Sequence, residues 1–115
     1  MSEPSDDELR ERYRPRLLAE AAELLAASGV TTADRRPVEL DQQSVGRLSR
    51  MDAMQQQAMA AAQEARRRAR KTAIEAALRR LDEGEFGWCT DCGEFIGTER
   101  LDLDPTLMRC VDCAR

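Results

Sequence analysis

Apolar side chains in the first quarter of the chain recur at a helical period. The stripe repeats every three or four positions and is widened by two further leucines: Leu9, Tyr13, Leu17, Ala21 and Leu24, with Leu18 and Leu25. Ser5 suits an N-cap, and the three acidic residues after it favour the helix dipole. Ser28 and Gly29 supply a stop. The pattern predicts a helix over about residues 5–28.

Pro15 lies inside this predicted helix, where a proline removes a backbone hydrogen bond and restricts Arg14 before it. We therefore expect either a kink at this point or a later helix start. Residues 29–40 have no helical period and contain Pro37, so we expect a loop there.

A second, much longer helix is predicted from about residue 44 to Glu83, because the segment consists almost entirely of helix formers, with Gly46 near its start. One apolar stripe lies along it, thickened at its C-terminal end: Val45, Leu48, Gln55, Met59, Ala62, Ala69, Ala73 and Ala76, with Ile74, Leu78 and Leu81. Alanine lets two helices approach closely, so the first helix is predicted to fold back antiparallel along the second.

The last 27 residues contain two C-x-x-C pairs, separated by 17 residues and comprising every cysteine of the chain: Cys89, Cys92, Cys110 and Cys113. Two such turns can each present two thiolates to one tetrahedral zinc ion, and this spacing is typical of a four-cysteine zinc ribbon or finger. Gly93 follows the second cysteine, where we expect the backbone to approach sulfur so closely that a Cβ would be in the way.

Two other uses of the cysteines compete with zinc binding. Structural disulfides require an oxidising compartment, and the acidic, polar N-terminus has no apolar segment typical of a secretory signal. A thioredoxin-like redox pair is disfavoured by the presence of two pairs and by the lack of a βαβ pattern. Four cysteine ligands close the site, so the zinc is expected to fold the domain and not to catalyse a reaction.

Composition narrows the possible functions. The 115 residues contain 3% aromatic residues and no histidine, which excludes Ser-His-Asp and Cys-His catalytic devices, and we expect no enzyme. No run approaches the ~18 apolar residues of a membrane span, so a cytoplasmic protein without membrane contact is predicted. The fold class is mainly α, with a helical hairpin over residues 1–83 and a zinc finger over residues 84–115.

The net charge of −4 is unevenly distributed. Residues 64–83 carry seven Lys or Arg against four Asp or Glu, whereas residues 84–115 carry three against seven. A nucleic-acid-binding zinc ribbon that uses the basic segment on phosphates is therefore one hypothesis, although the acidic finger disfavours it. A thiol redox or metal-sensing enzyme is another, and it would need accessible thiolates that zinc does not occupy.

The segment FGWCTDCG at residues 86–93, followed by Ile96-Gly97, Arg100-Leu101, Pro105 and CVDC at residues 110–113, closely resembles the C-terminal zinc finger of the DksA/TraR family. The resemblance implies a coiled-coil hairpin that enters the secondary channel of bacterial RNA polymerase and alters open-complex stability from its tip. It implies a monomeric transcription regulator that binds polymerase and does not bind DNA sequence-specifically.

The family's D-x-x-D-x-A tip pattern is absent from this chain, because an ungapped count from the first cysteine places it on Gly46, Ser49 and Met51. Asp52-Ala53 is the first alternative for the active tip and Asp41 the second. Equally, Asp52 could be a solvated helix residue and Asp41 an N-cap.

The same count aligns Arg66 with a family arginine that supports polymerase binding. Arg66 belongs to a basic band: Arg66, Arg67, Arg68, Arg70 and Lys71. This band is either a solvated helix face or a surface that binds an acidic channel, and we favour the second interpretation. The three basic residues through which a family member binds ppGpp align with Ala73, Asp104 and Ala114. We therefore predict no ppGpp binding through that site.

Overall fold

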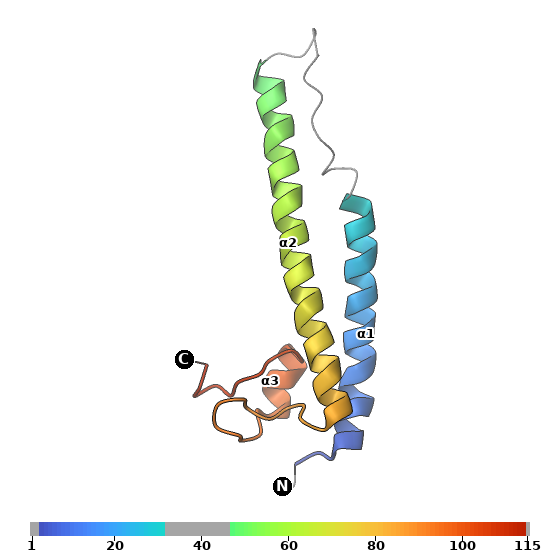
Figure 1. The fold of residues 1–115 in the computed structure, drawn as a ribbon, viewed down its shortest axis with the longest axis vertical. Helices are drawn as coiled ribbons and strands as arrows, with labels where there is room; N and C mark the ends of the chain where they lie inside the picture. Colours follow the sequence, from blue (N-terminus) through green and yellow to red (C-terminus); the bar gives the residue numbers. More distant parts are fainter. Residues whose placement is uncertain (1–2, 32–46, 115) are drawn as a thin grey trace. The chain divides into compact units, whose positions relative to one another are not determined.

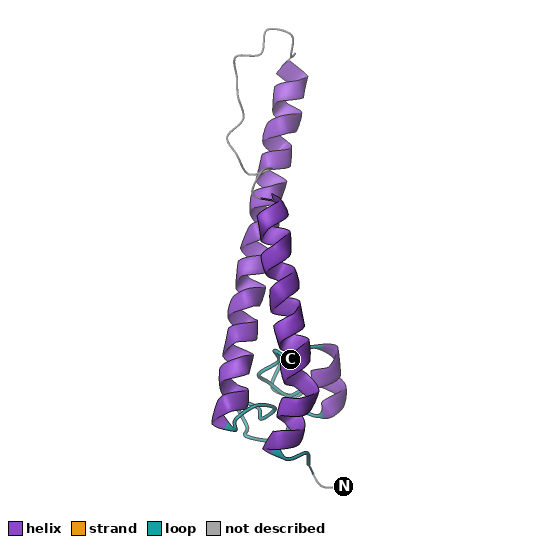
Figure 2. Ribbon diagram, turned by 90° about the vertical axis from the view of Figure 1, so that its right-hand side faces the viewer, coloured by secondary structure: helices purple, strands orange, loops and turns teal. Residues whose placement is uncertain are grey.

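The computed structural model describes residues 3–31 and 47–114, which form three helices: α1 (Asp6–Thr31), α2 (Arg47–Glu83) and α3 (Thr98–Leu103) (Figure 1). Helices and loops make up this part of the chain (Figure 2). Its only strand-like feature is an isolated antiparallel bridge between Trp88 and Phe95. The predicted class, a mainly α hairpin followed by a four-cysteine module, is confirmed. None of the described helices is both long and apolar enough to cross a membrane.

The chain divides into two compact units. We call residues 1–21 and 72–115 the finger unit, and residues 22–71 the middle unit. Each unit contains part of α1 and part of α2.

The finger unit has a core of large apolar side chains. The start of α1 lies antiparallel to the end of α2, and the Arg10 Nε donates a hydrogen bond to the Leu81 carbonyl at 2.9 Å (Figures 1 and 2). The rings of Tyr13 and Phe86 are 5.2 Å apart. Seven large side chains are almost completely buried: Leu9, Tyr13, Leu17, Ile74, Leu81, Phe86 and Leu101. Their burial joins α1, α2 and the finger into one core.

Asp102 of α3 fastens the finger to α1. The Arg12 Nε and the Tyr13 hydroxyl donate hydrogen bonds to its Oδ1 at 3.0 and 2.9 Å, and Arg16 donates to its carbonyl oxygen at 2.8 Å. The hydrogen bond from Arg12, and then that from Tyr13, lowers the pKa of Asp102. Burial of the phenol, together with its hydrogen bond to Asp102, raises the pKa of Tyr13 to about 12. This carboxylate therefore connects two elements that lie far apart in the sequence.

Helix α1 begins before Pro15 and continues past Gly29, so the later start was the wrong alternative, and the predicted stop falls short. Contacts on both sides of the proline hold the helix in place: Tyr13 and Leu17 are buried, and Arg14 pairs with Asp82 of α2. Tertiary packing thus overrides the local cost of the proline. The helix includes the first three residues of the predicted loop and ends at Thr31; residues 32–40 lie outside the described part.

Gly84 ends α2, as the sequence predicted. Its φ of 76° lies in the left-handed region, where glycine is favoured, and the Glu85 N–H donates to the Arg80 carbonyl at 2.9 Å. A Cβ at Gly84 would also meet the Asp6 Oδ2 at 3.0 Å. The left-handed backbone is therefore the main reason for glycine here, because the exposed Asp6 side chain could move away from a Cβ.

The middle unit has a different interior. Its buried residues on α2 are Ala60 and Glu64, and Glu64 is only 7% exposed. The Glu64 carboxylate accepts a hydrogen bond from Arg67 Nε at 3.2 Å, and Arg68 Nε lies 3.7 Å from its other oxygen. Leu24 and Ser28 of α1 lie with Glu64 and Arg67 around a small hollow of about 170 Å³. The polar group buried here therefore belongs to ion pairs formed within α2.

The predicted apolar stripe of α2 is wrong in this unit. Four members of that stripe are exposed: Gln55, Met59, Ala62 and Ala69. The bulky residues at its C-terminal end are buried or half-buried, as expected: Ile74, Leu78 and Leu81. The buried line instead passes through Ala53, Gln57, Ala60, Glu64 and Arg67. Alanine gains little free energy from burial, so the bulky residues Ile74, Leu78 and Leu81 decide which face of the helix turns inward.

Candidate metal centre and contact residues

The four cysteines converge on one point. The sulfur atoms of Cys89, Cys92, Cys110 and Cys113 all lie within 4.8 Å of one another. In a tetrahedral site with Zn–S bonds of about 2.3 Å, the sulfurs are about 3.8 Å apart. The Cys92 and Cys110 sulfurs are 3.7 Å apart. This donor set fits a closed four-thiolate zinc site, and the prediction of zinc as the cofactor is confirmed.

Backbone hydrogen bonds shape the first knuckle. The Cys89 N–H donates to the Glu94 carbonyl at 2.8 Å, and the Gly93 N–H donates back to the Cys89 carbonyl at 2.9 Å. The Cys92 N–H also points at the Cys89 sulfur, at 3.5 Å. The reason predicted for Gly93 is wrong, because a Cβ there would meet nothing within 4 Å. Its φ of 77° explains the glycine instead.

The electrostatics favour a thiolate at Cys89. Backbone N–H donors, first that of Cys110 and then that of Cys92, lower the pKa of its thiol to about 6. The neighbouring thiols, led by Cys110, raise the pKa of Cys113, because four sulfurs this close cannot all carry charge without a cation. A divalent ion bound among them would remove this conflict and stabilise the thiolates.

The second knuckle is held to the first and to α3. The Thr90 N–H donates to the Met108 carbonyl at 2.8 Å, and Arg100 donates to the Arg109 carbonyl at 3.1 Å. Asp104 accepts hydrogen bonds from the backbone N–H and the hydroxyl of Thr106, at 3.0 and 2.7 Å. Asp104 thus has a structural role in the turn after α3.

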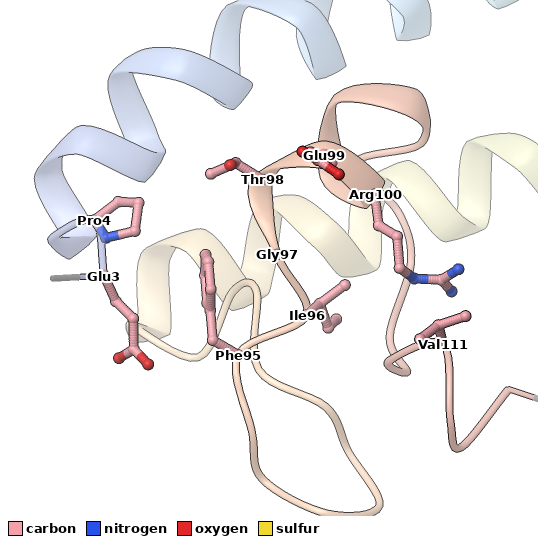
Figure 3. Close-up of a pocket in the computed structure, with 9 residues that line it drawn as sticks. All are labelled: Glu3, Pro4, Phe95, Ile96, Gly97, Thr98, Glu99, Arg100 and Val111. Atoms are coloured by element: carbon pink, nitrogen blue, oxygen red, sulfur yellow. The ribbon is translucent and has the colours of Figure 1, made fainter. Parts of the chain in front are cut away.

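A shallow hollow of about 660 Å³ lies beside the finger (Figure 3). Phe95 and Ile96 lie between Glu3 on one side and Arg100 and Val111 on the other. The Arg100 Nε is buried, and no hydrogen-bond partner for it is found among the described residues. Phe95 also contacts the edge of Trp88, with ring centroids 5.3 Å apart, so the aromatic residues serve as finger core.

Three of the four predicted polymerase-binding residues lie on α2, away from the cysteines in the sequence. Asp52 and Arg66 are exposed, whereas Ala53 is half-buried. Asp41 lies outside the described residues. Of the Asp52-Ala53 pair, the aspartate is therefore the more accessible to another molecule.

Two polar clusters were not anticipated from the sequence. In the sequence, Asp102 contributes only to the acidic charge of the finger, and nothing near it indicates the contact with Arg12. The pair of Glu64 and Arg67 could have been predicted, because the two residues are three positions apart on α2. Both also fall on the heptad pattern that runs back along the helix from Leu81, Leu78 and Ile74.

The comparisons with known proteins agree with this geometry. Residues 84–115 match the family described as prokaryotic dksA/traR C4-type zinc finger. A 40-residue segment is 52% identical to the RNA polymerase-binding transcription factor DksA of Haemophilus influenzae, and 42% identical to that of Escherichia coli K12. The segment is 35% of this chain, and it covers 28% and 26% of those relatives.

The likeness extends to the fold. The solved structure of transcription factor DksA2 from Pseudomonas aeruginosa superposes with a TM-score of 0.72 at 25% sequence identity. The superposition covers 95% of this chain and 79% of that one. Because the superposition covers nearly the whole chain, the similarity of fold includes the helical part as well as the finger.

Proposed function

Since this chain is DksA-like and ends in a zinc finger of the dksA/traR C4 type, we propose that it regulates transcription by binding bacterial RNA polymerase. The convergence of four sulfurs within 4.8 Å, in the segment that matches the family, is the observation that carries the proposal. Residues 84–115 act as the finger and residues 1–83 as the hairpin. The protein is cytoplasmic, monomeric and not an enzyme in this proposal.

The hairpin enters the secondary channel and changes initiation or the stability of the open complex. Asp52 supplies the acidic group near the tip, with Ala53 beside it, and Arg66 contributes to polymerase binding. The exposure of Asp52 and Arg66 supports these roles. Asp41 is the alternative acidic group.

The regulator works without the ppGpp site found in the family. Ala73 and Ala114 have no charge to offer a phosphate, and Asp104 would repel one. The contacts of Asp104 with Thr106 support a structural use of this carboxylate. Titration of the polymerase complex with ppGpp is expected to show no site that depends on residues 104 and 114.

The proposal is tested with purified protein, core RNA polymerase and a ribosomal promoter. The wild type is expected to bind polymerase and to change the lifetime of the open complex. Asp52→Asn should retain binding and lose most of the effect on lifetime, while Glu75→Gln, an equal charge change at an exposed position of α2, should behave like the wild type. Failure of the wild type to bind polymerase would refute the proposal.

Binding to DNA or RNA alone would favour the alternative of a nucleic-acid-binding zinc ribbon. That activity would weaken steeply with salt, because it would depend on arginine–phosphate contacts. Polymerase binding in the absence of nucleic acid would separate the two functions.

A further inference from the structure

Helix α2 carries an exposed apolar face in the middle unit. Seven side chains fall within an arc of about 100° and along about 27 Å of helix. We call them the outer α2 face: Met51, Met54, Ala58, Ala61, Ala62, Ala65 and Ala69, all of them exposed. Met51 and Met54 are 57% and 54% exposed, so the face includes large apolar groups as well as alanines.

This face lies on the side of α2 away from the line of residues that is buried in the described part of the chain. On the opposite side of α2, Glu64 is buried and Arg67 is half-buried. Turning the methionines and alanines inward would have buried more apolar surface and left the ion pair in water. The observed rotation instead leaves a continuous apolar strip open, as at surfaces that contact other molecules.

The charges beside the strip indicate the chemistry of its partner. Arg66 lies along one edge and Arg68 along the other, and both are exposed. Such edges suit a protein surface whose apolar side chains are flanked by carboxylates. Alanines let a partner's backbone approach closely, while flexible methionines adapt to its shape.

A second copy of this chain is a poorer occupant. A strip about 27 Å long and about 10 Å wide offers roughly 270 Å² per partner, whereas a stable interface needs about 800 Å² per partner. Face-to-face pairing of two copies would also bring the arginine edges together. The strip therefore suits one part of a larger contact with a different, acidic protein.

We propose that the outer α2 face docks against an acidic surface with apolar side chains on RNA polymerase. This inference rests on the proposed function and adds to it the face of α2 that makes the contact. Neighbouring positions provide a matched test: Ala62 lies on the face and Gln63 lies about 100° away from it, and both are exposed. Ala62→Glu and Gln63→Glu each add one carboxylate to the same helical turn.

The dissociation constant for core polymerase is measured for both variants and the wild type, with thermal melts and sedimentation as controls. Ala62→Glu should weaken binding at least about tenfold through like-charge contact and loss of fit, and Gln63→Glu less than about twofold. If Ala62→Glu fails to fold, Ala65→Glu replaces it, with the same expectation.

Each other result overturns the inference. Wild-type binding with equal effects of the two variants refutes the docking face and leaves the proposed function intact. No binding by the wild type refutes both. A wild-type dimer that Ala62→Glu dissociates would assign the face to a second copy. A melting temperature lowered only by Ala62→Glu would show that the face packs within the chain.

Discussion

The finger unit and the middle unit contain stretches of the same two helices, yet they bury different chemistry. Tyr13, Leu17 and Phe86 fill the interior of the finger unit, whereas Ala60 and the Glu64 carboxylate are buried on α2 in the middle unit. Large apolar groups gain far more from leaving water than alanine does, and a buried ion pair gains little. Folding stability is therefore concentrated around the finger, whereas the middle unit leaves large apolar side chains such as Met51 and Met54 exposed.

Removal of zinc is expected to give the largest effect, because it removes the finger from the more stable unit. Structural zinc contributes roughly 10–16 kcal/mol of apparent binding free energy in zinc-finger peptides. Cys110→Ser or chelation should abolish the near-ultraviolet circular dichroism of Trp88, which lies in the finger, and should leave part of the far-ultraviolet helix signal. Asp112→Asn, at an exposed position of the second knuckle, serves as the control. An unchanged Trp88 signal after complete zinc removal would contradict the expectation.

The second largest effect is expected from truncating an aromatic side chain in the core of the finger unit. Phe86→Ala is expected to lower the free energy of unfolding by about 3–5 kcal/mol, because it leaves a cavity against Tyr13. Met54→Ala, at an exposed position of the middle unit, should change it by less than about 0.5 kcal/mol. Urea unfolding measures both. Similar values for the two variants would mean that the units do not differ as described.

Substitutions in the ion pair of the middle unit are expected to change the free energy of unfolding by smaller amounts. Glu64→Ala should cost about 1–3 kcal/mol, because it removes a carboxylate that accepts a hydrogen bond from Arg67. The double variant Glu64→Leu, Arg67→Leu should be neutral or more stable than the wild type by up to about 4 kcal/mol. Equilibrium unfolding in urea decides between these outcomes, and a double variant less stable than Glu64→Ala would show that the ion pair is a net source of stability.

The smallest expected effect is a shift in the titration of Tyr13. Its phenolate absorbance can be assigned directly, because Tyr13 is the only tyrosine of the chain. Its phenolate absorbance should titrate near pH 12 and not near pH 10, the ordinary tyrosine value. The raised pKa stabilises the fold fully below pH 10, and this contribution is lost as the pH rises from 10 through 12.

Asp102→Asn should lower the Tyr13 midpoint only part of the way, since burial is the larger cause of the shift. Asp82→Asn, which alters a carboxylate that pairs with Arg14, is the matched control. A wild-type midpoint near pH 10 would contradict the buried, hydrogen-bonded phenol.

The finger could be predicted from the sequence because its information is local. Cys89 and Cys92 share one short turn, and so do Cys110 and Cys113, so the spacing alone indicates the metal. The end of α2 at Gly84 was predictable for the same reason. The reason for Gly93 was not, because a spacing pattern does not distinguish a steric need from a left-handed backbone.

The rotation of α2 could not be read from its alanines. An alanine-rich helix has apolar residues on several faces, so periodicity alone leaves the buried face undecided. The decisive residues were Ile74, Leu78 and Leu81, whose heptad leads back through Arg67, Glu64 and Ala60. This heptad predicts the observed buried face of α2 only if charged residues are allowed at some of its positions. The tip alternative Asp41 remains a prediction, because it lies outside the described residues.

The bond between Arg12 and Asp102 joins residues 90 positions apart, and it has a consequence for biosynthesis. At about 5–20 residues per second, a ribosome needs roughly 5–20 s to make that span. Until the finger emerges, Leu9, Tyr13 and Leu17 have no core to enter, and a nascent helix alone does not cover them. The earliest part of this chain can therefore bury its apolar side chains only after the latest part has been made.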